Sequence, residues 1–243
     1  MDFKNAKELL ELCQKQNLPI SEIMLRREMT EGEMPEEEAR SRMARALAIM
    51  KESAHTPIQT PVRSMGGLIG GEAAKLRAAL EDADPQHRLV DPLAARAAQY
   101  ALATLETNGR MGVIVATPTA GSAGVLPGVL LALRDERGFS HDQLREGILT
   151  AAGLGYLIAR NASVSGAEGG CQAEVGSAAA MAAAAAVAMA GGTPAQALDA
   201  ASNVIQSLLG LVCDPVGGLV ELPCQKRDAT AAPMALVCAQ IAL

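Results

Sequence analysis

Hydrophobic residues recur along most of the chain at the spacing of amphipathic helices. Leu9, Leu10 and Leu12 give the first segment an apolar face. Long stretches rich in Ala, Glu, Leu and Arg, with few β-branched runs, favour helix over strand. We therefore predict an all-α protein built around a single helical domain. The pattern places its helices within residues 2–54, 92–105, 125–134, 142–160, 172–190 and 194–209, with a final helix after residue 228.

The segment from Val175 to Ala190 is apolar on every side, which predicts a helix buried in the centre of the bundle. The alternative is a membrane-spanning helix. Against this alternative, the segment is built from Ala rather than Leu or Ile, and Gln172, Glu174 and a Gly-Gly pair flank it. We expect a core helix and no membrane.

Two prolines interrupt the helical pattern between His55 and Arg63. The residue before a proline avoids the helical conformation, so we expect an extended connector here. The connector divides the chain into an N-terminal helical arm, residues 1–54, and a larger body, residues 55–243.

Paired glycines follow directly in residues 64–71, which we call the glycine loop. Because glycine lacks a side chain, its backbone can approach another group closely. Two interpretations stay open. The glycines form a notch for a neighbouring helix, or Ser64, Gly66 and Gly67 line a substrate site.

A second loop of small residues, the small-residue loop, runs from Thr117 to Gly124 and leads into the helix expected from Val125. Such a loop offers free backbone N–H groups and the positive end of a helix dipole. It is not a nucleotide-binding P-loop, since no Gly-Lys-Ser/Thr follows. A carboxylate is therefore its expected occupant.

Three of the five cysteines, Cys171, Cys213 and Cys224, stand within two residues of glycine or proline where the helical pattern is interrupted. Cys13 and Cys238 fall within helices and are expected to pack as small hydrophobes. The spacing of the three does not match the Cys-x-x-Cys pairs of structural zinc sites. It leaves two alternatives, an iron–sulfur cluster bound by all three thiolates or unrelated buried cysteines. Cys171 precedes a helix, whose dipole is expected to lower its pKa.

Composition and charge limit the partners and the cellular compartment that we expect for this protein. The net charge is −6 and aromatic residues make up 2% of the chain, with no Lys/Arg stripe, so nucleic acid is not an expected partner. The charged amphipathic start lacks the apolar region of a secretory signal, which predicts a cytoplasmic protein. Cysteines in that reducing compartment are not expected to form disulfides.

Four motifs resemble the alpha subunit of iron–sulfur-dependent L-serine dehydratase (L-serine ammonia-lyase). They occur in residues 64–75, 116–124, 168–174 and 213–224. The resemblance implies an all-helical catalytic body that converts L-serine to pyruvate and ammonia without pyridoxal phosphate. It also implies a [4Fe-4S] cluster on Cys171, Cys213 and Cys224, whose open iron activates the substrate hydroxyl. The residues implied to bind substrate are Thr119, Ala120, Gly121 and Ser122, which would hold its carboxylate, and Ser64, Gly66 and Gly67.

The family resemblance also implies a separate beta subunit and an oligomeric enzyme. Family members run beyond Leu243, so this chain is expected to be C-terminally short, and Asp228 stands where the family pattern has Asn. Lys75 and His55 are candidates for the base that removes the Cα proton, unless the partner supplies it. Two rival functions remain: a related lyase that desulfurates cysteine, and an inactive helical subunit whose cysteines only pack.

Overall fold

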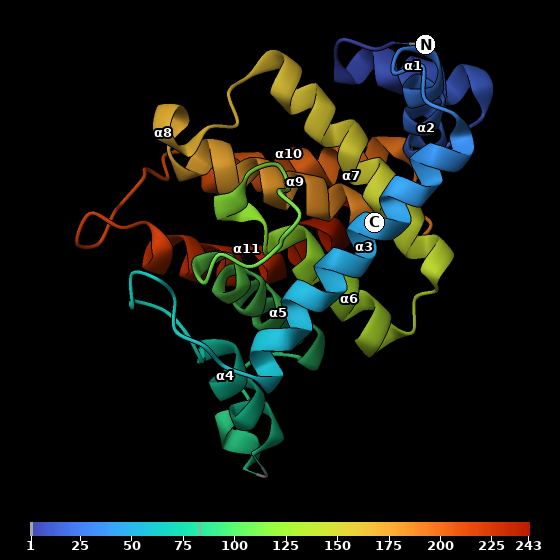
Figure 1. Ribbon diagram of the computed structural model, residues 1–243. Coiled ribbons are helices and arrows are strands. Elements are labelled where there is room, and N and C mark those ends of the chain that lie inside the picture. The colour runs from blue at the N-terminus through green and yellow to red at the C-terminus, as the bar shows by residue number, and fades with distance from the viewer. Residues whose placement is uncertain (1, 83) are drawn as a thin grey trace.

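Helices form nearly all of the regular structure in the computed structural model, which describes residues 2–82 and 84–243 (Figure 1). An isolated bridge between Val216 and Leu219 is the only β feature in this described part. The all-α prediction is confirmed. The α-helices are α1 Ala6–Gln16, α2 Ile20–Thr30, α3 Glu36–Gln59, α4 Glu72–Glu81, α5 Pro92–Gly109, α6 Val125–Arg137, α7 His141–Asn161, α8 Gly166–Gly169, α9 Cys171–Met189, α10 Pro194–Leu208 and α11 Glu221–Ala242, and the 3-10 turns are η1 Pro85–His87 and η2 Ala120–Ser122.

The alanine-rich helix α9 lies at the centre, with α6, α7, α10 and α11 packed around it. Every residue from 175 to 187 is buried, as the sequence predicted. Small residues also permit close packing between the other helices: a Cβ added to Gly128 of α6 would lie 2.7 Å from the Ala97 carbonyl oxygen of α5. In the described residues α9 alone is apolar and long enough to cross a membrane, but 78% of that stretch is buried inside the protein. It is therefore better explained as a core helix.

The N-terminal helices pack on the same core as the rest of the chain. Leu9 of α1, Ile23 of α2 and Met50 of α3 belong to one hydrophobic cluster with the buried alanines of α9. Tyr156 of α7 provides a further anchor, because Phe3 packs edge-on against its ring at 5.3 Å. On that ring the Arg27 guanidinium also stacks, 3.7 Å from its centre.

The extended connector predicted from His55 to Arg63 is wrong over its first half, since α3 continues to Gln59 and contains Pro57. A proline inside a helix leaves the carbonyl four residues earlier without its usual partner. Here the Thr107 hydroxyl of α5 donates to that carbonyl, Ser53 O, at 2.8 Å. Helix α3 thus crosses the boundary drawn between residues 54 and 55, and the division into an arm and a body stays a prediction.

Helix starts with a local capping signal were predicted correctly. Asp91 accepts a hydrogen bond from the Leu93 N–H at 2.8 Å at the start of α5, and Thr193 caps α10 in a capping box with Gln196. The last helix was predicted too late. Helix α11 begins at Glu221, so Cys224 lies in its first turn and not in a loop.

Several connections meet at one end of the bundle. Figure 1 shows the loop 209–220, α8 and the first turn of α11 on the same side of the molecule. We call this region, together with the first turn of α9, the thiol end, because Cys171, Cys213 and Cys224 lie within these segments.

Candidate active site

Backbone contacts bring Cys213 to the start of α9. Gly170, which has a φ of +75°, packs against residues 211–213, and a Cβ there would lie 3.0 Å from the Leu211 carbonyl oxygen. The Gln172 N–H donates to the same oxygen at 2.7 Å. A side chain at residue 170 would push residues 211–213 away. The glycine before Cys171 therefore allows the Cys213 loop to cross the N-terminus of α9.

Arg227 connects α11 to the same place. Its guanidinium donates to the Cys171 Sγ at 2.9 Å and to the Val212 carbonyl oxygen at 2.7 Å. The side chain also pairs with Asp214 at 3.7 Å. Arg227 lies three residues after Cys224, so one arginine links the three segments that carry the cysteines.

The three thiols differ in burial. Cys171 and Cys224 are buried and Cys213 is exposed. Burial raises the pKa of Cys171, although the hydrogen bond and charge of Arg227 oppose the shift. The lowered pKa predicted from the helix dipole is therefore wrong. Burial, with added effects of Glu174 and the other two thiols, raises the pKa of Cys224 to about 12.

The charge of Cys213 adds to the raised pKa of both Cys171 and Cys224, after the larger effect of burial. Within residues 2–82 and 84–243, however, no three Cys, His, Asp or Glu side chains are close enough to hold a metal ion. A cluster differs from a single ion in that each thiolate binds its own iron, so the sulfurs stand further apart. The donor set fits a cluster in its chemistry, since all three groups are thiols carried by segments that Arg227 joins.

The small-residue loop already holds carboxylates of the protein. The Thr119 hydroxyl donates to Oε1 of Glu174, a residue of the first turn of α9. The Gly124 N–H, expected to be free, donates to Oδ2 of Asp228 at 2.9 Å. Ser122 is fully buried, with its hydroxyl 3.0 Å from that of Thr119. The loop donates hydrogen bonds to carboxylates, as its residues predict, but these carboxylates belong to Glu174 and Asp228 of the same chain.

Asp228 has no exposed surface, and its Oδ1 has no hydrogen-bond partner in the described part of the chain. Burial raises its pKa well above the usual value, the Gly124 hydrogen bond opposes this shift, and the charge of Glu174 adds to it. The carboxyl group therefore holds its proton well above the usual pH range of an aspartate.

The glycine loop likewise holds a carboxylate. Glu221, the first residue of α11, accepts hydrogen bonds from the Ser64 hydroxyl at 2.6 Å and from the Gly66 N–H at 2.8 Å. A Cβ at Gly66 would lie 2.5 Å from Leu219 and 2.8 Å from the Glu221 carboxylate. Gly67 has open space around it at a φ of +74°. The close approach allowed by Gly66 is thus to side chains at the thiol end, rather than to the flank of a helix.

The two candidate bases lie apart from these groups. His55 hydrogen-bonds to the Lys51 carbonyl oxygen at 2.7 Å and stacks on Tyr100 at 4.9 Å. It lines a cavity of about 210 Å³ with Arg77. Lys75 is exposed on α4. In the described residues, neither side chain has a hydrogen bond or ion pair to a cysteine or to the small-residue loop.

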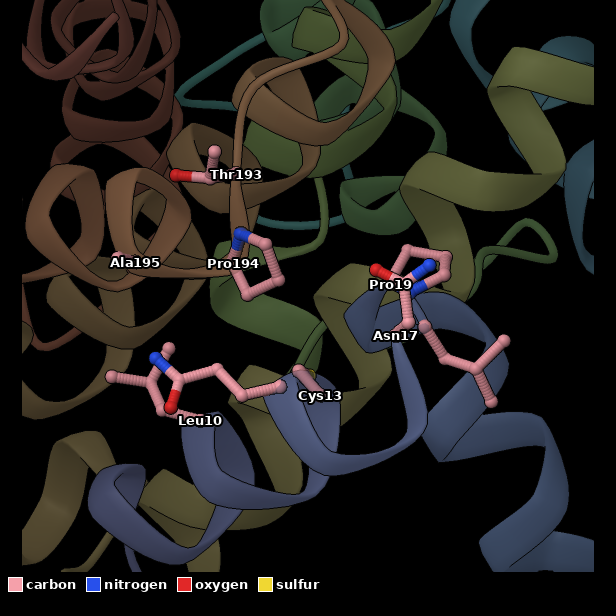
Figure 2. Close-up of a pocket in the computed structure, with 9 residues that line it drawn as sticks. Leu10, Cys13, Asn17, Pro19, Thr193, Pro194 and Ala195 are labelled. Atoms are coloured by element: carbon pink, nitrogen blue, oxygen red, sulfur yellow. The ribbon is translucent and has the colours of Figure 1, made fainter.

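A larger cavity of about 520 Å³ lies between the end of α1 and the start of α10. Figure 2 shows Cys13 and Pro194 among its lining. None of its lining residues is charged, and none belongs to the predicted site. Cys13 and Cys238 both pack in the core, as predicted.

Three functional candidates were missed from the sequence: Glu174, Glu221 and Arg227. Each is three residues from a cysteine, Glu174 after Cys171 and the other two on either side of Cys224. That spacing places side chains on one face of a helix. Pro223 gave a local signal that α11 starts before Cys224, since proline is tolerated in the first turn of a helix.

The fold and site together define an all-α protein with three thiols and a set of internal carboxylates gathered at one end of the bundle. A family model described as "Serine dehydratase alpha chain" matches residues 15–243. The chain therefore belongs to the serine dehydratase alpha chain family, and the family resemblance predicted from the motifs is confirmed.

Individual relatives agree with this assignment. The chain is 45% identical over 241 residues to the "Probable L-serine dehydratase, alpha chain" of Bacillus subtilis (strain 168), covering 99% of this chain and 79% of the relative. It is 40% identical to the "L-serine dehydratase, alpha chain" of Peptoniphilus asaccharolyticus, covering 99% and 82%. It is 36% identical to the "L-serine dehydratase" of Helicobacter pylori (strain ATCC 700392 / 26695), covering 100% of this chain and 53% of that longer protein.

Proposed function

We propose that this chain is the alpha chain of an L-serine dehydratase, a lyase that converts L-serine to pyruvate and ammonia. The similarity over 99% of the chain to a relative of that name carries the proposal. The convergence of the predicted motifs adds support, because the glycine loop donates to Glu221 and the small-residue loop to Glu174, each three residues from a cysteine of the thiol end.

We propose further that Cys171, Cys213 and Cys224 bind a [4Fe-4S] cluster. Thiolates are the ligands that such clusters require. With only three protein ligands one iron stays open, and when bound the cluster would supply a Lewis acid that makes the serine hydroxyl a better leaving group. Activation of this kind replaces the electron sink of pyridoxal phosphate.

The chain's own residues would bind and orient the substrate. The small-residue loop would receive the carboxylate of serine through its backbone N–H groups and the Thr119 hydroxyl, whose one proton would turn from Glu174 to the substrate. Thr119 would contact the substrate, and buried Ser122 would hold the Thr119 hydroxyl in place. Removal of the Cα proton and of the β-hydroxyl group as water leaves aminoacrylate. Its imine tautomer then reacts with water to give pyruvate and ammonia.

A beta chain would complete the enzyme. Two of the relatives are named alpha chains, and the longer Helicobacter pylori protein extends well beyond the matched region. The oligomeric state and the cytoplasmic location stay predictions.

The test is a deaminase assay on the anaerobically assembled alpha–beta complex. Pyruvate should form from L-serine much faster than from L-cysteine, and each chain alone should show little activity. Faster release from cysteine would favour the desulfurating lyase. Absence of iron, sulfide and activity in the complex would favour a helical subunit whose cysteines only pack.

A further inference from the structure

The Glu174 carboxylate lies between the first cysteine and the small-residue loop. It belongs to the first turn of α9, three residues after Cys171, and it is half-buried. Thr119 donates its hydroxyl to Oε1. A Cβ added to Gly121 would lie 2.7 Å from the same oxygen, and a Cβ at Gly166 would also meet the carboxylate. Two glycines therefore leave just enough room for this carboxylate beside the loop.

The charge of Glu174 is not neutralised by a nearby cation. None of the ion pairs within the described residues includes Glu174, and Arg227 is directed to Cys171, Val212 and Asp214. The nearby Asp228 carboxyl group, which is fully buried, is itself acidic, and the charge of Glu174 acts to raise its pKa. A partly buried carboxylate in such surroundings is stabilised by a positive ligand.

An α-amino acid carries both charges on one carbon atom. Its binding site needs hydrogen-bond donors for the carboxylate and, next to them, an acceptor for the ammonium group. With the Thr119 hydroxyl turned to the substrate carboxylate, the small-residue loop would supply the donors, and the freed Oε1 of Glu174 would supply an anionic acceptor beside them. The arrangement matches the charge pattern of a zwitterion.

We propose that Glu174 binds the α-ammonium group of the substrate and thereby selects amino acids over acids that lack the amino group. This specificity role rests on the proposed function, in which the small-residue loop binds the substrate carboxylate. It assigns Glu174 no part in proton transfer.

The alternative is that Glu174 merely anchors Thr119. A neutral glutamine would accept the Thr119 hydrogen bond as well, so an anchor does not need the charge. Recognition of an ammonium group does need it. Glu174→Gln therefore separates the two roles.

The experiment is anaerobic titration calorimetry on the assembled complex with two probes, L-alanine and propionate. The probes differ only by the ammonium group, and neither has a hydroxyl group to eliminate. The wild-type complex should bind L-alanine at least 10-fold more tightly than propionate. Glu174→Gln should weaken L-alanine binding about 10- to 100-fold and leave propionate binding within about 2-fold, as for loss of one charge-assisted hydrogen bond.

Glu37→Gln is the matched control, because it removes the same charge from an exposed glutamate on α3, outside the predicted site; it should change neither affinity. Glu174→Asp, which keeps the charge, should retain part of the preference for L-alanine, and a thermal melt checks that each variant folds. Equal loss of both probes in Glu174→Gln, or unchanged L-alanine binding, would overturn the proposal while leaving the carboxylate loop intact. If propionate and L-alanine both fail to bind the wild-type complex, the proposed role of the loop is wrong as well.

Discussion

The two parts of helix α9 have different surroundings and different roles. Residues 175–187 are buried among other helices and consist largely of alanine. The first turn, which contains Cys171 and Glu174, contacts loops and side chains that lie far away in the sequence, including Thr119, Leu211 and Arg227. One helix thus combines a close-packed centre, which stabilises the fold, with a polar end, which carries the candidate chemistry.

Buried polar atoms without a partner lie mostly beside the two loops. Of the four buried side-chain atoms without a partner in the described residues, Thr117 Oγ1 and Asp228 Oδ1 lie in or against the small-residue loop. Glu106, whose Oε2 is a third, accepts a hydrogen bond from the Ala73 N–H just beyond the glycine loop. The fourth, Thr150 Oγ1, lies in α7. Native proteins leave few such atoms unpaired, and three of these four lie in or beside the small-residue and glycine loops.

The largest change in the free energy of unfolding is expected from a substitution in the buried centre of α9. Ala183 is fully buried in α9, so Ala183→Leu forces three extra carbon atoms into a close-packed region. We expect a loss of about 3 kcal/mol in the free energy of unfolding, measured by urea denaturation. Ala190→Leu, at the exposed end of the same helix, should change it by less than about 0.5 kcal/mol. Equal effects would show that the centre is not tightly packed.

A change at Asp228, which lies against the small-residue loop, should raise the free energy of unfolding instead of lowering it. Because the pKa of Asp228 is raised by burial, the folded protein keeps a proton that the unfolded chain loses as pH rises above the usual carboxyl range. Stability therefore falls with rising pH through that window. Asp228→Asn removes this dependence and should stabilise the protein by about 1 to 2 kcal/mol near pH 8. The gain should shrink towards pH 4, and a gain that is constant from pH 4 to pH 8 would contradict the raised pKa.

The smallest effect is expected where the glycine loop meets α11. Although partial burial acts to raise it, hydrogen bonds from Ser64, Gly66 and Leu68 hold the pKa of Glu221 below its usual value. This contribution to stability is present above the usual carboxyl pKa and is lost as pH falls through the lowered one. Ser64→Ala should cost about 1 kcal/mol at neutral pH.

Ser163→Ala serves as the control for Ser64→Ala, because Ser163 also donates to a glutamate, Glu168, but within an exposed local turn. It should have almost no effect on thermal unfolding. If both variants melt alike, the contact between Ser64 and Glu221 does not hold the glycine loop.

The sequence predicted the centre better than the polar end, for a physical reason. Burial of α9 and the starts of α5 and α10 follow from periodicity and from caps such as Asp91 and Thr193, which act within a few residues. The extension of α3 through Pro57 depends on Thr107, which lies fifty residues further along. The early start of α11 is accompanied by a contact from Glu221 to Ser64, 157 residues away. No local pattern contains these partners.

The candidate site shows the same limit. The cysteines and both loops were recognised by residue type, but the sequence did not reveal that Glu174, Asp228 and Glu221 would occupy the predicted anion sites. It also placed His55 and Lys75 among the candidate bases, where the structure gives them no contact with the site in the described residues. The type of a residue indicates which chemistry it can perform. Which side chains surround it depends on the tertiary fold.

The central claim, that Cys171, Cys213 and Cys224 bind one cluster at the thiol end, is tested most directly by the iron and sulfide content of five single Cys→Ala variants reconstituted without oxygen. Replacing any of these three should abolish the brown colour and the bound iron, whereas Cys13→Ala and Cys238→Ala, which alter core cysteines, should keep both. Full iron and sulfide in the Cys213→Ala variant would contradict the claim.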